Sequence, residues 1–203
     1  MSKYYYILDP GHGGLIDNVY QTQGKRSPIW KDSTIYYEGV GNRQIAKKVG
    51  DILDKLDIDY TYTVLPDNGK DVSLTTRINF VNKLPMKNKV LISIHSNGAS
   101  VESASGFEIF TSAGQTLSDT IATVIFEEFE KEFKNSKFRK DTSDGDVDKE
   151  NPLYITGKSN CPAVLLECFF MTNEKECKEI LMTEEGQNRI VKCIVQAICR
   201  LEQ

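Results

Sequence analysis

Long apolar runs are absent from this sequence. Nowhere do about 18 consecutive apolar residues occur, the length that a membrane-spanning helix needs, so we expect no membrane insertion. The residues that follow Met1 also lack the apolar stretch of about 7–15 residues that a signal peptide requires. We therefore expect the protein to be synthesised in the cytoplasm without a signal peptide.

Cysteine pairs with a functional spacing are absent as well. The five cysteines all lie in the last quarter of the chain, and no two have the Cys-x-x-Cys spacing of a zinc knuckle or a redox site: Cys161, Cys168, Cys177, Cys193 and Cys199. We expect free thiols that pack as small hydrophobic groups.

Neither sign of charge is in large excess. The 25 basic and 29 acidic residues are mixed along the chain and give a net charge of -4. Nucleic-acid-binding proteins usually show a basic patch or stripe, so we expect no nucleic-acid partner. The length of 203 residues fits one domain with a substantial core, and no repeat, low-complexity tract or linker divides the chain.

Short apolar runs alternate with segments of helical periodicity. Buried strands are predicted at Tyr4–Leu8, Tyr60–Leu65, Val90–Ile94, Gly106–Thr111 and Val164–Phe170. Helices are predicted at 42–56, 73–84, 117–133, 174–182 and 184–202, and the polar segment 134–151 is predicted to be a long loop. Strands interleaved with helices predict an α/β fold, a layered sheet with helices on both faces.

The only two histidines occupy comparable places. His12 lies in DPGHGG directly after the first predicted strand, and His95 lies at the end of the strand predicted at 90–94. Ligands of α/β sheets gather beyond the carboxyl ends of the strands, and neutral imidazole is a good zinc ligand. The pair therefore indicates a metal site. The alternative is that each histidine only forms hydrogen bonds at the start of a loop.

A third metal ligand cannot be chosen by pattern alone among 29 acidic residues. Glu38 is attractive because it precedes the glycines of Gly39–Gly41 and the helix at 42–56. An exposed carboxylate stabilised by the dipole of that helix is nearly as good an interpretation of Glu38.

Glu167 is the only charged residue between Cys161 and Phe170. Burying a lone carboxylate costs several kcal/mol unless the group is paired, protonated or beside a cation. A carboxylate beside a metal-bound water acts as a general base. The alternative is a solvent-facing strand residue, which the apolar neighbours on both sides of the alternation argue against.

Two further motifs are incomplete. Asp144–Asp148 resembles the start of a calcium loop, but an EF-hand needs Gly at the sixth position and Glu at the twelfth, where Lys149 and Ile155 stand. The glycines after the first strand lack the Gly-x-Gly-x-x-Gly pattern of a dinucleotide site, because Ile16 follows three residues after Gly13. We predict neither an EF-hand nor a dinucleotide site.

The assembled motifs resemble the zinc-dependent N-acetylmuramoyl-L-alanine amidases of amidase family 3. The matching segments arrive in the order of that family and span nearly the whole chain: DPGHGG at 9–14, Glu38 before a helix, LTTRINFVN at 74–82, SIHSN at 93–97, GFEIFTS at 106–112 and CPAVLLECFFMTN at 161–173. Segments 24–30 and 144–151 are similar to a branch of the family found in gut-type bacteria and their phages.

The resemblance implies a site and a fold. One zinc ion would be held by His12, Glu38 and His95, with Glu167 as the catalytic residue, on a central mixed, largely parallel sheet of about six strands. The stretch from His12 to Glu38 is long for this family, so Asp17 and Asp32 are alternatives for the third ligand. Asp9 would either orient His12 or form the turn.

The resemblance also implies a function. Residues 1–203 would form a single catalytic domain, with no separate cell-wall-binding module, that hydrolyses the amide between N-acetylmuramic acid and L-alanine in bacterial peptidoglycan. A zinc peptidase of the stem peptide and an inert wall-binding module of the same fold are the alternatives, and retention of all four site residues favours an enzyme. We expect action on the wall after release, as by a phage lysin.

Overall fold

A six-stranded sheet forms the centre of the computed structural model, which describes residues 2–203. Its strand order is β4-β1-β5-β8-β6-β7, with these bounds: β1 Tyr5–Pro10, β4 Tyr60–Tyr62, β5 Lys89–Asn97, β6 Glu108–Thr111, β7 Lys149–Glu150 and β8 Ala163–Phe170. The adjacent strands β4, β1, β5 and β8 pair in parallel, whereas β6 runs antiparallel to β8. The predicted mixed, largely parallel sheet is therefore confirmed.

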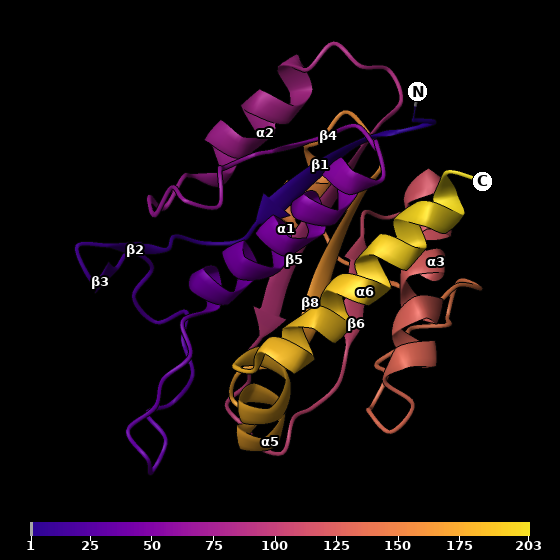
Figure 1. Ribbon diagram of the computed structural model, residues 1–203. Coiled ribbons are helices and arrows are strands. Elements are labelled where there is room, and N and C mark those ends of the chain that lie inside the picture. The colour runs from indigo at the N-terminus through magenta and orange to yellow at the C-terminus, as the bar shows by residue number, and fades with distance from the viewer. Residues whose placement is uncertain (1) are drawn as a thin grey trace.

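Helices cover both faces of this sheet, as predicted. On one face α1 (Glu38–Lys55), α6 (Glu184–Leu201) and α3 (Leu117–Glu132) lie side by side (Figure 1) and bury the larger apolar core. On the other face α2 (Leu74–Lys83) and α4 (Tyr154–Gly157) cover a smaller core. Because the central strands are buried on both sides, their sequences are almost continuously apolar, as is usual in parallel sheets.

Helix ends follow the side-chain caps in the sequence. The Ser73 hydroxyl accepts the Thr76 N–H at 3.2 Å and begins α2, which ends at the predicted place before Pro85. Thr116 and Asp119 form a reciprocal capping box at the start of α3. The helix predicted at 42–56 begins earlier than its apolar pattern, at Glu38, which is therefore its first residue.

The last part of the chain contains a short helix, α5 (Glu174–Glu176), that continues as the π-helix η1 (Cys177–Leu181) before α6. The helices predicted at 174–182 and 184–202 are thus both present. All five cysteines are free thiols, and three of them, Cys168, Cys177 and Cys193, are buried.

Segment 134–151 differs from the expected unpatterned loop. Phe138 and Val147 pack against the larger core, Phe138 bridges to Phe107, and Lys149–Glu150 forms the edge strand β7. Phe138 and Val147 are isolated apolar residues in a polar segment. They show no helical or strand periodicity, so the sequence pattern did not predict their burial.

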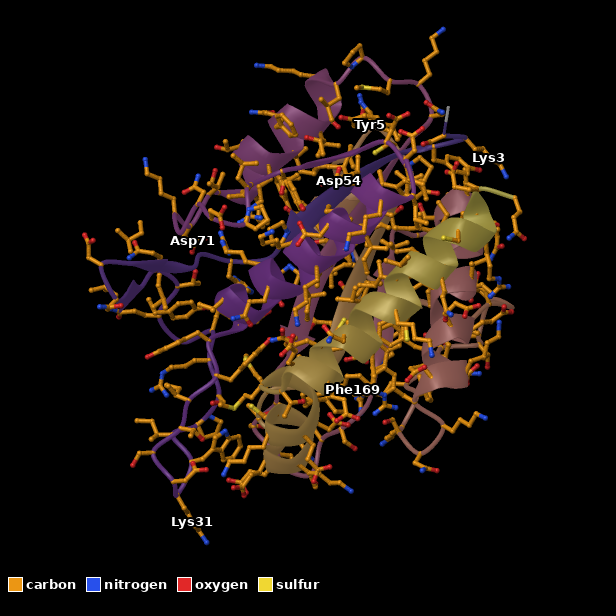
Figure 2. The ribbon with its side chains drawn as sticks, in the orientation of Figure 1. Lys3, Tyr5, Lys31, Asp54, Asp71 and Phe169 are labelled. Carbon is orange, nitrogen blue, oxygen red and sulfur yellow. The ribbon has the colours of Figure 1, made fainter. Side chains whose placement is uncertain are left out.

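A hairpin that the pattern did not predict follows His12. Its strands β2 (Leu15–Ile16) and β3 (Val19–Tyr20) pair antiparallel and extend beyond the sheet (Figure 1). The segment between β3 and α1 then forms a projecting loop, with Lys31 near its tip and pointing away from the sheet (Figure 2). None of the helices in residues 2–203 is long and apolar enough to cross a membrane.

Candidate active site

The predicted site residues converge at the carboxyl edge of the sheet. His12 follows β1 and His95 lies near the end of β5, and these two strands are parallel neighbours in which Pro10 pairs with Ile94. Glu38, which is the first residue of α1, lies at the same edge of the sheet. His12 has a φ of 64°, a left-handed conformation that is uncommon outside glycine and turns the chain out of the strand.

One carboxylate oxygen joins the two histidines. Glu38 Oε1 lies 3.2 Å from His12 Nε2 and 3.0 Å from His95 Nδ1. The two imidazole rings are nearly perpendicular, at 88°, with their centroids 4.9 Å apart. One ligand atom from each of the three residues lies within 4.8 Å of the ligand atoms of the other two. This His–Glu–His cluster therefore has the donors and the spacing to hold a metal ion.

Glu38 is ionised in this environment. Its side chain is only 2% exposed, and burial by itself would raise its pKa, but the hydrogen bonds with His12 and His95 lower that pKa well below its usual range. The backbone N–H of Ser96 donates a third hydrogen bond to Oε1 at 3.3 Å. The cluster therefore presents a fixed negative charge between two imidazoles.

Two glycines allow this close approach. A Cβ on Gly11 would lie 2.1 Å from Cε1 of His95, and a Cβ on Gly39 would lie 1.9 Å from the Gly13 carbonyl oxygen. Any side chain at either position would therefore displace a histidine or the loop that carries His12.

Two buried arginines hold the loop at His12. The His12 carbonyl oxygen accepts hydrogen bonds from Arg43 Nη1 at 2.7 Å and from Arg77 Nη2 at 2.9 Å. Arg77 also pairs with Asp9 at 2.8 Å, and Ser93 donates to the other oxygen of that carboxylate at 2.6 Å.

Asp9 therefore acts on His12 indirectly. The expectation that its carboxylate orients the His12 ring is wrong, because its side-chain hydrogen bonds go to Arg77, Ser93 and Thr63. Neither arginine was among the predicted site residues. A charged residue on the apolar face of a predicted helix could have indicated such a role. Arg77 is an example, because it adjoins Ile78 and both are buried in α2.

Glu167 lies beside the cluster. In the parallel pairing of β5 with β8 it is directly opposite His95, and in the antiparallel pairing with β6 it is opposite Glu108. Its Oε2 atom is enclosed and has no hydrogen-bond partner. Burial raises the pKa of Glu167 to about 8; the carboxylates of Glu38 and Glu108 add to the shift, and His95 opposes it.

Glu38, His95 and Glu167 line one pocket of about 380 Å³. The other residues around this pocket come from the loop before α1, from the end of β5 and from the end of β8: Gly24, Lys25, Arg26, Ser96, Asn97, Gly98, Ala99, Ser100, Met171 and Thr172. The site is thus an open pocket at the edge of the sheet.

The two alternative third ligands lie elsewhere. Asp17 is exposed in the turn between β2 and β3. Asp32 is exposed in the projecting loop, where it forms an ion pair with Lys178 at 2.8 Å. Glu38 is the acidic residue that the fold brings to both histidines.

A His–Glu–His cluster beside an unpaired glutamate, at the carboxyl edge of an α/β sheet, defines a hydrolase-type site. Comparison with known families gives the particular class. Residues 7–200 match the family described as N-acetylmuramoyl-L-alanine amidase, and the chain belongs to this family. It is accordingly an amidase that acts on bacterial peptidoglycan.

Solved structures of amidases share this fold. An N-acetylmuramoyl-L-alanine amidase from Clostridium difficile 630 is 28% identical, with a TM-score of 0.77 over 98% of this chain and 97% of that one. The amidase Ami1 from Mycobacterium smegmatis is 20% identical (TM-score 0.78; 98% and 96% covered). The catalytic domain of the CD27L endolysin that targets Clostridia difficile is 20% identical (TM-score 0.67; 97% of each chain). A search of curated proteins found no match.

Proposed function

We propose that the protein hydrolyses the amide between N-acetylmuramic acid and L-alanine in a zinc-dependent reaction. His12, Glu38 and His95 would hold one zinc ion, and Glu167 would be the catalytic base. The observation that carries this proposal is the convergence of two imidazole nitrogens on one oxygen of Glu38, with Glu167 in the next strand.

The residues of the cluster fit a zinc ion. Two imidazoles and one carboxylate are a recurrent ligand set of catalytic zinc sites, which leave a position open for water. Glu38 is buried and ionised, and among the described residues its ion-pair partners are the two histidines. When bound, zinc would lower the pKa of a water molecule and polarise the carbonyl of the substrate.

Glu167 has the position and the unpaired oxygen that a proton carrier needs. Its free Oε2 accepts the proton of the attacking water and returns it to the amine of the departing L-alanine. Glu38 instead stays ionised and holds the histidines.

Substrate binding is proposed to come from this one domain. Lys25 and Arg26 line the pocket at the sheet edge, which would receive the sugar–peptide junction. A role as a lysin that reaches the wall after release is part of the proposal, and the fold shared with the CD27L catalytic domain is compatible with it.

Product analysis tests the proposed reaction. Digestion of purified sacculi should release stem peptides with a free amino group on L-alanine and leave lactyl groups without peptide on the sugar. New amino termini within the stem peptide would show a peptidase instead, and no cleavage at all would show an inert wall-binding module. Metal analysis of the same preparation should find about one zinc per chain.

A further inference from the structure

A second cluster of acidic side chains lies away from the catalytic pocket. Asp119 belongs to the first turn of α3, and Asp146 and Asp148 directly precede β7. One carboxylate oxygen from each residue lies within 4.8 Å of those of the other two. β6 begins opposite Glu167 and runs antiparallel to β8, so its other end, at Thr111, lies away from the catalytic edge. The Thr111 hydroxyl contacts Asp148 and so places the acidic cluster at that end.

The three carboxylates are enclosed and incompletely paired. Asp148 is 1% exposed and Asp119 is 5% exposed, and the Oδ1 atoms of these two residues and of Asp146 are all buried without a hydrogen-bond partner. Three unsatisfied oxygens at one point are unusual, because buried carboxylates are normally paired or bound to a metal.

The other oxygen of each carboxylate fixes its position. Asp148 accepts a hydrogen bond from the Thr111 hydroxyl, and Asp119 accepts one from the Thr116 N–H. Asp146 accepts one from the Gln115 side chain at 3.1 Å. Each residue therefore uses one oxygen for support and leaves the other unpaired.

Positive charge is missing from this cluster. Among residues 2–203, no lysine or arginine forms an ion pair with any of the three carboxylates. The nearest basic residue in sequence, Lys149, is bound to Glu108 instead. Burial raises the pKa of Asp148 to about 7; a proton shared with the Asp146 carboxyl and the charges of Asp146 and Asp119 add to the shift, and the Thr111 hydroxyl opposes it.

We propose that Asp119, Asp146 and Asp148 form a binding site for a hard divalent cation, preferably calcium, separate from the catalytic centre. All of the donors are oxygens, and calcium takes six to eight oxygen ligands in flexible geometry. Zinc favours nitrogen and sulfur, which this cluster lacks, and magnesium retains most of its water. The site does not depend on the proposed catalytic function.

This site explains the incomplete calcium motif in the sequence. Asp144–Asp148 begins like an EF-hand loop but lacks the glutamate at the twelfth position. The fold supplies the missing carboxylate from another element, Asp119 of α3. A bound cation would hold the loop before β7 against α3 and so keep the edge strand, with Lys149, beside Glu108.

Calcium titration of the purified full-length protein tests the proposal. In buffer freed of divalent cations, calorimetric titration with CaCl2 should show one calcium ion bound per chain. Calcium at 1 mM should raise the unfolding temperature by about 5 °C, the shift expected for a ligand at about 100 times its Kd. NaCl of equal ionic strength should give no such rise, and a response to magnesium as large as that to calcium would overturn the preference for calcium.

Matched variants locate the effect. Asp148→Asn and Asp146→Asn should each weaken calcium binding at least about tenfold, because each removes one charged ligand. Both should also raise the unfolding temperature in calcium-free buffer, because repulsion within the cluster is relieved. Asp144→Asn, an exposed residue of the same loop, removes the same charge and should retain the calcium response.

Three results would overturn the proposal: a wild-type protein without a calcium response, a full response in both Asp146→Asn and Asp148→Asn, or an equal loss in Asp144→Asn. The last would show that overall charge is responsible. If Asp148→Asn does not fold, Asp146→Asn carries the test, because Asp146 is partly exposed and its substitution disturbs the core less.

Discussion

His95 lies directly opposite Glu167 in the parallel pairing of β5 with β8. Residues paired in this way project from the same side of the sheet, so both side chains reach the same pocket. His95 also contacts Glu38, whereas Oε2 of Glu167 has no partner. Two glutamates at one site thus have different surroundings, and this difference predicts different roles.

Replacement of Glu167 by Gln should abolish hydrolysis while the zinc content and the fold stay normal. The amide keeps the shape of the side chain but cannot accept a proton from water. We expect the rate of muropeptide release from purified sacculi to fall by at least about 10²-fold, the low end for loss of a general base.

Glu38→Gln is the matched comparison, because it makes the same change at the proposed metal ligand. Zinc content and activity should fall together in this variant. If Glu167→Gln loses its zinc while Glu38→Gln keeps it, the two roles are reversed. An active Glu167→Gln variant would contradict the proposed mechanism.

Loss of either histidine should empty the metal site. The chain contains no third histidine that could take over. We expect His12→Ala and His95→Ala each to lower zinc affinity by about tenfold or more, since even groups that only support a ligand contribute 10- to 100-fold. Zinc content is measured by elemental analysis after dialysis, with circular dichroism to confirm folding. Full zinc content in the double variant would disprove the assignment of these ligands.

A single methyl group at Gly11 should disturb the same site without removing any ligand. The Cβ of Gly11→Ala would lie 2.1 Å from Cε1 of His95, so the ring must move. We expect weaker zinc binding and lower activity. Gly157→Ala is the control, because a Cβ there meets no atom within 4 Å. Equal zinc affinity in the two variants would show that His95 tolerates the displacement.

Asp9 should make the stability of the protein depend on pH. Burial by itself would raise the pKa of Asp9, but the Arg77 guanidinium and the Ser93 hydroxyl lower it below its usual value. The stabilisation is therefore fully present above the pKa of the unfolded chain, about 3.9, and is lost as the pH falls below it. Asp9→Asn should lower the free energy of unfolding at pH 7 by about 3–5 kcal/mol, because Arg77 is left buried and unpaired.

Urea unfolding of both proteins at pH 7 and pH 3 measures this effect. The difference between wild type and Asp9→Asn should narrow at pH 3, because below about pH 3.9 the unfolded chain binds a proton at Asp9 more readily than the folded protein does. Asp59→Asn, which removes an exposed carboxylate without an ion pair among the described residues, should differ little from wild type at either pH. A constant difference for Asp9→Asn would mean that shape and not charge stabilises this position.

Local pattern determined most of the architecture. Compact apolar runs such as Val90–Ile94 form strands, because a sheet covered on both faces buries every side chain of such a run. Helical periodicity and the Ser73 cap placed α2 within a residue of its ends. The two histidines, one just after a buried strand and the other near the end of the next parallel strand, indicated the edge at which the site lies, because parallel strands end together.

Contacts between distant segments were decided only by the tertiary structure. The local sequence favours Glu38 only weakly over Asp17 or Asp32, and the start of α1 beside β1 and β5 decides between them. The support of His12 by Arg43 and Arg77, and the meeting of Asp119 with Asp146 and Asp148, have the same origin. Periodicity reports which face of an element is buried, whereas the convergence of single atoms depends on strand order and register, and only the folded chain establishes these.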